Sequence, residues 1–342
     1  MYVEVNSKVN KKTYEIRRIS EYDIETSLDI PADHFNIIIE NPIDEKGYGV
    51  NADVFNPNDS LKISEDYGVI LNGIADDVDE YWDDNGSKIE IGGRDKSMIL
   101  LENDAEPKTY YKLKLSTFIS KIAGPYGFKA KVNSKHDKVI SKIVVEVGDS
   151  EWDAIFRETK KLGMWLWCTP DGTLVADVLN YSGSPNYKFS NDLAIDAIRM
   201  KRFSKKKRGA DIKSEVWVKG QSGMSYATYP PSQTRILSKF KDAALTTLGY
   251  VRRMIIEDGE AKSVSKGQEI AKRHIQERKR GSFEIEIAIN GKYPIETNKT
   301  AYVKDKVTKT DGVFFIVGVR DKKNTNIGHE KIIRLRPLWE GL

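Results

Sequence analysis

The chain has 342 residues, of which 39% are hydrophobic and 31% charged, a composition typical of a folded soluble protein rather than a disordered or fibrous one. This length predicts two or three domains. The single cysteine, Cys168, excludes an internal disulfide, and no stretch approaches the roughly 18 uninterrupted apolar residues of a membrane span. The N-terminal segment has no apolar core after its charges, so we expect no signal peptide and a protein that folds in the cytoplasm.

The net charge of +4 conceals an uneven distribution along the chain. Residues 1–110 hold 11 Lys and Arg against 25 Asp and Glu, a balance of −14, and the remainder carries a balance of +18. A basic run, RMKRFSKKKRGADIK, spans residues 199–213. Because no aromatic interleaving or known DNA-binding motif accompanies it, we interpret it as a solvated loop or strand edge and expect no specific nucleic acid. Acidic and basic ends can also complement one another in an assembly.

Alternating apolar residues predict short strands in the first part of the chain. The apolar positions are Phe35, Ile37 and Ile39, then Leu61 and Ile63, and then Ile89 and Ile91. Asn41-Pro42 ends the first of these strands, and the turn Asp84-Asn85-Gly86 precedes the last. Short strands bounded by such turns predict an antiparallel β-barrel over residues 1–105.

Helical spacing replaces this alternation in the middle of the chain, where residues 106–185 are predicted to form a small α/β insertion. The first predicted helix carries Leu115, Phe118, Ile119 and Ile122 on one face and ends at Gly124-Pro125. The second begins at the N-cap Ser150, carries Trp152, Ile155, Phe156 and Leu162, and ends at Gly163. The sequence MWLWCTPDGTLVADVL then predicts a hairpin that turns at Pro170, Asp171 and Gly172, with Trp165 or Trp167 packed against the face of Trp152.

The last part of the chain, residues 186–342, returns to strand patterns and is predicted to form a second antiparallel β-barrel. A helix over residues 264–279 precedes its clearest strand, with Ser265 and Gln268 in the spacing of a capping box. The alternating apolar residues are Phe283, Ile285, Ile287 and Ile289, then Phe315, Val317 and Val319, and then Ile333 and Leu335. The predicted fold is therefore mainly β, with two similar antiparallel β-barrel domains flanking an α/β region.

A weak internal repeat links the two predicted barrels. The segments VILNGIADD and GSKIEIGGR in the first half resemble FFIVGVRDK and GHEKIIRLR in the second. The matched positions are Gly73-Ile74 with Gly318-Val319, Gly86 with Gly328, and Lys88-Ile89 with Lys331-Ile332. Two unrelated hairpins that obey the same turn chemistry would give a similar match. If the match is a duplication, Ile89 and Ile332 should point the same way in their barrels, since a one-residue shift turns a strand's core face outward.

No catalytic or metal-binding pattern is present in the sequence. The four histidines, His34, His136, His274 and His329, have no ligand-like spacing. Cys168 lies in an apolar strand, as a buried inert thiol does. The acidic cluster Asp76, Asp77, Asp79, Glu80, Asp83 and Asp84 lacks the order of a calcium loop, so we interpret it as a solvated acidic hairpin. Paired carboxylates for glycan cleavage stay open, because they need proximity in space rather than in sequence. We predict no catalytic residue, no cofactor and no metal, and therefore no enzyme.

Three segments in the same chain order resemble the phage tail hub proteins of the late-control-D type, including XkdQ-like proteins of Gram-positive prophages and phage-like bacteriocins. The segments are IEIGGRDKSMILLENDA, then SEWDAIFRETKKLGMWLWCTPDGTLVAD, and then AKRHIQERKRGSFEIEIAINGKYPI with the final VGVRDKKN and IIRLRP. The matching residues include Gly93, Arg94 and Asp95 in the first, and Trp152, Gly163 and Gly172 in the second. The resemblance covers nearly the whole chain.

The resemblance implies a homotrimeric ring in the tail baseplate of a virion or phage-like particle, assembled in the bacterial host cytoplasm. The tail tube protein would bind above, a spike protein below and other baseplate proteins around it, without membrane insertion by this chain. Two similar barrels per chain would let three copies meet a sixfold tube and a threefold spike. The chain ends at Leu342 without a lytic domain, so we expect any wall cleavage to come from another protein. The alternative is a wall-degrading or wall-binding tail protein, in which Trp152, Trp165 and Trp167 stack on sugars.

Overall fold

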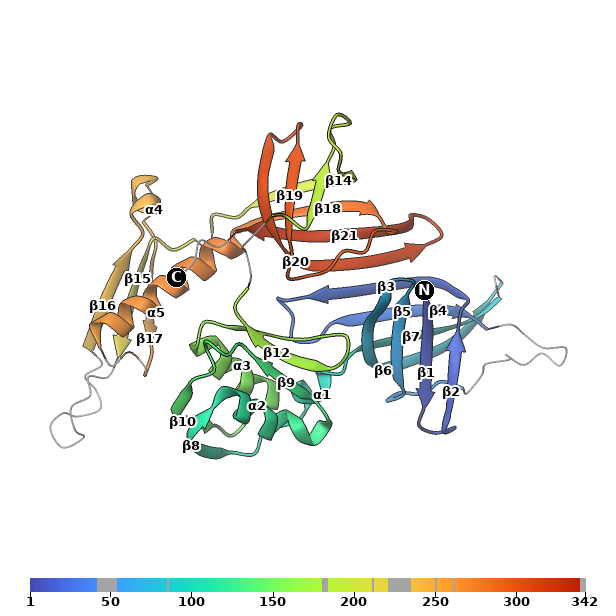
Figure 1. Ribbon diagram of the computed structural model, residues 1–342, viewed down its shortest axis with the longest axis horizontal. Helices are drawn as coiled ribbons and strands as arrows, with labels where there is room; N and C mark the ends of the chain where they lie inside the picture. Colours follow the sequence, from blue (N-terminus) through green and yellow to red (C-terminus); the bar gives the residue numbers. More distant parts are fainter. Residues whose placement is uncertain are drawn as a thin grey trace.

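The computed structural model describes residues 1–41, 54–84, 86–179, 184–210, 212–220, 235–249, 251–259, 261 and 263–338. Pro42, Asn85 and Leu342, which the sequence interpretation used, lie outside these residues. Figure 1 shows a C-terminal barrel at the top, an N-terminal β unit at the right, an α/β region below and a helix-covered small sheet at the left. No helix in the described part of the chain is long and apolar enough to cross a membrane.

Seven strands form the N-terminal unit, which curls around one apolar core. The strands are β1 Tyr2–Ser7, β2 Lys12–Ile16, β3 Ile19–Ser27, β4 His34–Glu40, β5 Ser60–Glu65, β6 Gly68–Asp83 and β7 Gly86–Asp95. Their order in the sheet is β3-β4-β7-β6-β5-β1-β2. The predicted apolar positions face inward, and Ile37, Ile63, Ile89 and Ile91 are at most 1% exposed. Alternation therefore identified both the strands and their buried face.

Six strands close the C-terminal barrel. They are β13 Tyr187–Ser190, β14 Ile198–Lys207, β18 Phe283–Asn290, β19 Thr300–Asp305, β20 Thr310–Asn324 and β21 Gly328–Pro337. Their order is β19-β13-β14-β18-β21-β20, and pairing of β20 with β19 closes the ring. The core includes Ile285, Ile287, Ile289, Ile333 and Leu335, as the alternation predicts. The mainly β fold with an α/β insertion is confirmed.

A second insertion interrupts the C-terminal barrel between β14 and β18, and the sequence interpretation missed its sheet. Its elements are β15 Glu215–Gly220, β16 Arg235–Lys241, α4 Ala243–Thr247, β17 Arg253–Glu257 and α5 Val264–Gly281. The three strands form a sheet of order β16-β15-β17, and α5 packs on it through Ile270 and Ile275. The predicted cap of α5 is wrong by two residues. Ser263, in extended conformation, accepts from the Lys266 N–H at 3.2 Å, whereas Ser265 lies inside the first turn.

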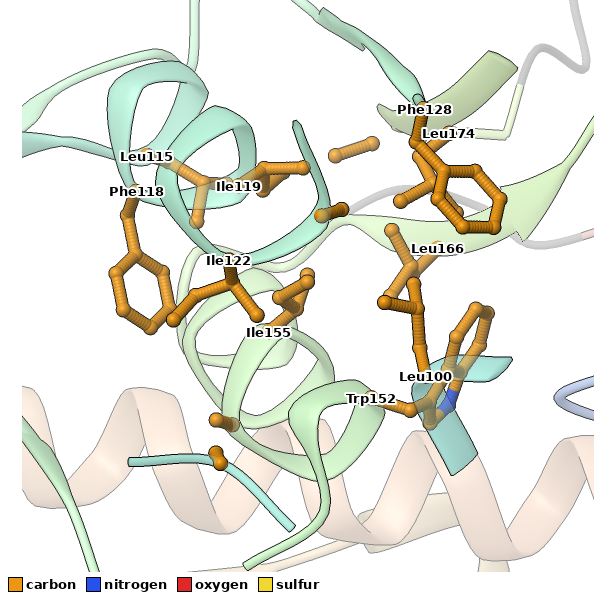
Figure 2. Close-up of a cluster of buried hydrophobic side chains, with 14 of the residues drawn as sticks. Leu100, Leu115, Phe118, Ile119, Ile122, Phe128, Trp152, Ile155, Leu166 and Leu174 are labelled. Atoms are coloured by element: carbon orange, nitrogen blue, oxygen red, sulfur yellow. The ribbon is translucent and has the colours of Figure 1, made fainter. Parts of the chain in front are cut away.

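The α/β region between the two units has its own apolar core, drawn in Figure 2. Its elements are α1 Met98–Glu102, β8 Lys108–Lys114, α2 Leu115–Ala123, the 3-10 turn η1 Gly124–Tyr126, β9 Lys129–Val132, β10 Val139–Val145, α3 Glu151–Lys161, β11 Trp165–Cys168 and β12 Thr173–Asp177. Both predicted helices are confirmed, including the Ser150 cap, whose hydroxyl accepts from the Asp153 N–H at 3.0 Å. Trp152 is 3% exposed in this core.

The predicted contact between the hairpin tryptophans and α3 is wrong. Leu166 is the β11 residue that enters the core, and period two sends Trp165 and Trp167 to the opposite face of the hairpin. There they pack beside Leu28, Leu179, Phe315 and Val317, between the α/β region and the two β units. Phe156 is also off the core face of α3, with 38% of its surface exposed.

Five strands of the N-terminal unit have counterparts in the C-terminal barrel. The order β3-β4-β7-β6-β5 corresponds to β14-β18-β21-β20-β19, and the strands follow one another along the chain in the same sequence. Both units also carry register shifts at matching places. One lies between Ile19 and Glu21 in β3 and between Met200 and Arg202 in β14. The other lies between Ala75 and Asp77 in β6 and between Ile316 and Gly318 in β20.

The sixth strand distinguishes the two units. β1 is antiparallel to β5, whereas β13 is parallel to β19 and closes its barrel against β14. Within the described part of the N-terminal unit, β1 instead pairs with β2. The unit is therefore a curled sheet whose first edge strand, β3, pairs outside the unit with β20.

The residue register of the predicted repeat is wrong by one in the last strand. Counting from the shared bulges, Ile89 corresponds to Lys331 and Ile91 to Ile333, not Ile89 to Ile332. Lys331 is 1% exposed, so a lysine occupies the inward position that Ile89 fills in the first unit. The sequence match aligned the two Lys-Ile pairs, but alternation along the strand decides which side chains point inward. The buried ammonium of Lys331 is held by the polar partners described below. Gly73 and Gly318 are likewise not equivalent, because Gly318 corresponds to Asp77.

Candidate functional site: the seam between the two β units

Strands β3 and β20 join the two units edge to edge into one 13-stranded sheet. The pairing is antiparallel and runs from Ser27 opposite Gly318 to Tyr22 opposite Lys323. Figure 1 shows the two strands side by side between the barrel and the N-terminal unit. Within its own unit, β3 pairs with β4 through its other edge. β20 pairs with β21 through its other edge and with β19 through its first half. We call this pairing the seam.

Opposite charges line one face of the seam. The Arg320 guanidinium donates to both carboxylate oxygens of Asp23, at 2.7 and 2.6 Å, and the Lys322 ammonium lies 3.3 Å from the same carboxylate. Arg334 of β21 donates to Glu25. Burial raises the pKa of Asp23, but the hydrogen bonds and charges of Arg320 and Lys322 lower it further, so the net pKa lies below the usual value. The acidic strand is β3 and the basic strand is β20.

A buried polar cluster occupies the end of the seam. Nε2 of His329 lies 2.9 Å from the Tyr22 hydroxyl and 2.8 Å from Asp321 Oδ1. The Lys331 ammonium lies 2.9 Å from Asp321 Oδ2 and donates to the Tyr67 hydroxyl at 2.9 Å and to the Gly291 carbonyl at 2.8 Å. Burial would lower the pKa of Lys331, but Asp321 and Tyr67 outweigh it and raise the pKa overall. Tyr22 and Tyr67 come from the N-terminal unit, so the cluster ties both units together.

The cluster also contains a group of side chains with metal-ligand chemistry. Ligand atoms of Glu65, Asp321 and His329 all lie within 4.8 Å of one another. A divalent cation fits this group poorly, because His329 and Asp321 already bond each other and the Lys331 ammonium already neutralises Asp321. The geometry is that of a structural ion-pair network. Sequence reasoning treated His329 as isolated, although Asp321, His329 and Lys331 flank one hairpin.

A pair of carboxyl groups, buried Asp95 and partly buried Asp33, lies where β4 and β7 meet the α/β region. Asp33 accepts from the Ser27 N–H at 2.7 Å, and Asp95 accepts from the N–H groups of Ser97 and Asp33 at 2.8 and 3.2 Å. Burial raises the pKa of Asp95 to about 6, although these hydrogen bonds favour the ionised form. Burial and the charge of Asp95 raise the pKa of Asp33 well above its ordinary range. Burial likewise raises the pKa of the neighbouring Cys168 thiol, which disfavours the reactive thiolate.

A cavity of about 640 Å³ opens between α3, the loop after β3 and α5. Its lining includes Phe156 and Trp165 with Asp29, Arg273 and Glu277 among the charged groups. Trp152 also borders it, but its 3% exposure leaves no ring face for a sugar. Trp167 lines a different, smaller cavity beside Cys168. The three tryptophans of the sugar-binding alternative are thus not brought together on one surface.

The remaining residues considered for metal binding are scattered. His136 borders the cavity, His274 lies on α5, and His34 lies 3.9 Å from Glu25. Of the acidic cluster, Asp76 accepts from Arg94 at 2.7 and 3.0 Å, while Asp77 and Asp79 are exposed along β6. Among the described residues, the cluster at the seam is the one group with metal-ligand spacing. The basic run begins in β14, as a strand edge, and its Asp211 lies outside the described residues.

Comparison with known proteins relates the α/β region to one domain family. Residues 102–177 match the model of baseplate hub protein gp44-like, second domain. This segment is similar to the second domain of gp44-like hub proteins. No curated protein sequence matches the chain.

The whole chain has the fold of phage tail proteins. The tail protein from Neisseria meningitidis MC58 superimposes with a TM-score of 0.80 at 20% identity, covering 98% of this chain and 96% of that one. The 43 kDa tail protein of prophage MuSo2 from Shewanella oneidensis gives 0.81 at 16% identity, covering 98% of both. A type VI secretion component of E. coli, described as similar to T4 tail proteins gp27 and gp5, gives 0.56 at 8% identity, covering 94% of this chain and 74% of that one. The resemblance to phage tail hub proteins found in the sequence is confirmed.

Proposed function

We propose that this chain is the structural baseplate hub of a contractile injection system, with three copies in a ring that joins a sixfold tail tube to a threefold spike. Its place is the tail baseplate of a virion or phage-like particle, and its partners are the tube, spike and other baseplate proteins. The gp44-like hub domain and the phage tail fold support this assignment. We further propose three domains, with the second boundary kept at residue 185 and the first moved from residue 105 to residue 97, because Leu100 of α1 and Ala105 belong to the core of the α/β region.

The observation that carries the proposal is the repeated β unit. Five strands occur twice in the same order with the same two bulges, and the seam joins the two copies edge to edge. One chain therefore presents two similar units side by side. Three such chains present six similar units to a sixfold partner and three whole chains to a threefold one. This role requires positioned surfaces and no catalytic group.

The cavity beside Trp165 favours the wall-binding alternative. An aromatic ring beside charged groups suits a sugar that carries hydroxyl and carboxylate groups. Titration of the protein with soluble peptidoglycan fragments, followed by tryptophan fluorescence, separates the two functions. Saturable binding that Trp165→Ala abolishes would support the alternative, and wall solubilisation would add an enzymatic role.

Copy number in the assembled particle tests the hub proposal directly. Cryo-electron microscopy of tail baseplates, or quantitative mass spectrometry against the tube protein, should give three copies of this chain per particle. Six copies in one ring would overturn the symmetry argument, because each chain already supplies two units.

A further inference from the structure

The two strands of the seam have counterparts elsewhere in the chain. The shared bulges make β14 the counterpart of β3 and β6 the counterpart of β20. In this equivalence Phe203 corresponds to Tyr22, and Asp77 corresponds to Gly318. The seam uses the last residues of β3 and the last residues of β20. The corresponding halves of β14 and β6 are therefore the places to examine.

Both counterparts are sheet edges within the described part of the chain. β13 pairs with β14 only at Ile198 and Arg199, and from Arg202 onward β18 is the one described strand beside it. β5 pairs with β6 only as far as Ile74, and from Asp77 onward β7 is the one described strand beside it. An edge strand with exposed backbone groups pairs readily with another chain.

We propose that β14 of one copy pairs antiparallel with β6 of the next copy, in the register of the seam. This inference rests on the proposed ring and names its contact. The register places Asp77 opposite Arg208, Asp79 opposite Lys206, and Trp82 opposite Phe203. Repeated three times, the contact alternates with the seam and closes one continuous belt of strands.

Charge complementarity supports the second copy as the occupant of these edges. Asp77 and Asp79 are exposed on β6, and Lys206, Lys207 and Arg208 are exposed on β14. Opposite charges directly across an antiparallel pair stabilise it. Trp82, with 79% of its surface exposed, would find the half-buried Phe203 across the pair. A tryptophan left in water on a monomer is explained if a neighbouring copy covers it.

In both contacts the N-terminal unit supplies the acidic strand and the C-terminal barrel supplies the basic strand. In the seam β3 is acidic and β20 basic, and in the proposed contact β6 is acidic and β14 basic. Pairing two N-terminal units through β3 and β6 would bring acid to acid, and pairing two C-terminal barrels through β14 and β20 would bring base to base. Like charges across an interface disfavour wrong partners. The opposite charges of the two units therefore favour their alternation around the ring.

Disulfide trapping in assembled tail particles tests the register. Val78 should lie opposite Lys207, so the double variant Val78→Cys/Lys207→Cys should give a covalent trimer on a non-reducing gel. Directly opposite residues in an antiparallel pair have Cα atoms about 4.5–5.5 Å apart, within the range that a disulfide spans. Thr26→Cys/Val319→Cys, the equivalent pair within the seam, is the matched positive control and should crosslink within one chain. Tyr81→Cys/Lys207→Cys, shifted by three residues on β6, should give at least tenfold less trimer.

The outcomes separate this inference from the hub proposal. Three copies per particle with an efficient seam crosslink but no Val78–Lys207 trimer would overturn the proposed contact and leave the hub intact. A copy number other than three would overturn the hub. A charge exchange gives an independent check: Asp77→Lys/Asp79→Lys should abolish particle assembly, and adding Lys206→Glu/Arg208→Glu in the same chain should restore it. Normal assembly of the first variant would contradict the inference.

Discussion

Lys331 offers the sharpest test of how the two β units are held together. Its side chain is 2% exposed, and its ammonium has three partners, Asp321, Tyr67 and the Gly291 carbonyl. Lys331→Met keeps the length of the side chain and removes the charge. Asp321, with a side chain that is 5% exposed, then stays buried without the ammonium that compensated its charge, while its contact with Nε2 of His329 is kept. Removing one partner of a buried ion pair costs about 3–5 kcal/mol.

Thermal unfolding followed by circular dichroism measures this loss. At about 2–4 °C per kcal/mol for a domain of this size, the first melting transition should fall by roughly 10 °C. Lys322→Met is the matched control, because Lys322 pairs with Asp23 on the more exposed face of the same hairpin. Its loss should stay below about 1 kcal/mol. The double variant Lys331→Met/Asp321→Asn should recover part of the stability, because it removes the uncompensated carboxylate. Equal, small losses for Lys331→Met and Lys322→Met would refute the reasoning.

Two further predictions concern the α/β region and its junction. Trp152→Ala should cost about 3–5 kcal/mol and lower the yield of soluble protein, measured by urea unfolding, because it empties a buried site; wild-type stability would show that Trp152 is not part of the core. Raising the pH should destabilise the fold through Asp95. Its folded pKa of about 6 lies above its ordinary value near 3.8, so its favourable contribution is complete below pH 3.8 and is lost as the pH rises through 6. The loss is about 3 kcal/mol, and Asp95→Asn should flatten it by removing the titrating carboxyl group; stability that rises between pH 5 and 7 would contradict this cause.

Strands and helices with one clear buried face were predictable from the sequence. Phe35, Ile37 and Ile39 are buried as their alternation predicts, and the Ser150 cap and Gly163 end fix α3 as expected. These elements obey local rules of pleat, helical period and capping. The seam is different, because Tyr22 and Lys323 are three hundred residues apart and nothing local links them.

The errors came from positions where a side chain's type and its burial disagree. Lys331 is buried because charged partners meet it in space, so a comparison of residue types shifted the repeat by one. Trp165 is large and apolar yet lies outside the core of the α/β region, since Leu166 already occupies the inward position. The sheet beneath α5 was missed because its order depends on a non-local parallel pairing of β15 with β17, and because Val216 and Val218 are buried only by the helix that follows.

The pairing of β3 with β20 has a geometric consequence for assembly. Backbone hydrogen bonds along six residues, reinforced by Arg320 and Lys331, hold the two units edge to edge. The angle between neighbouring units is therefore set inside a single chain, before a second copy arrives. In the proposed ring, repetition of this angle would fix the number of units that close it, so the curvature of one chain's sheet would set the diameter of the opening.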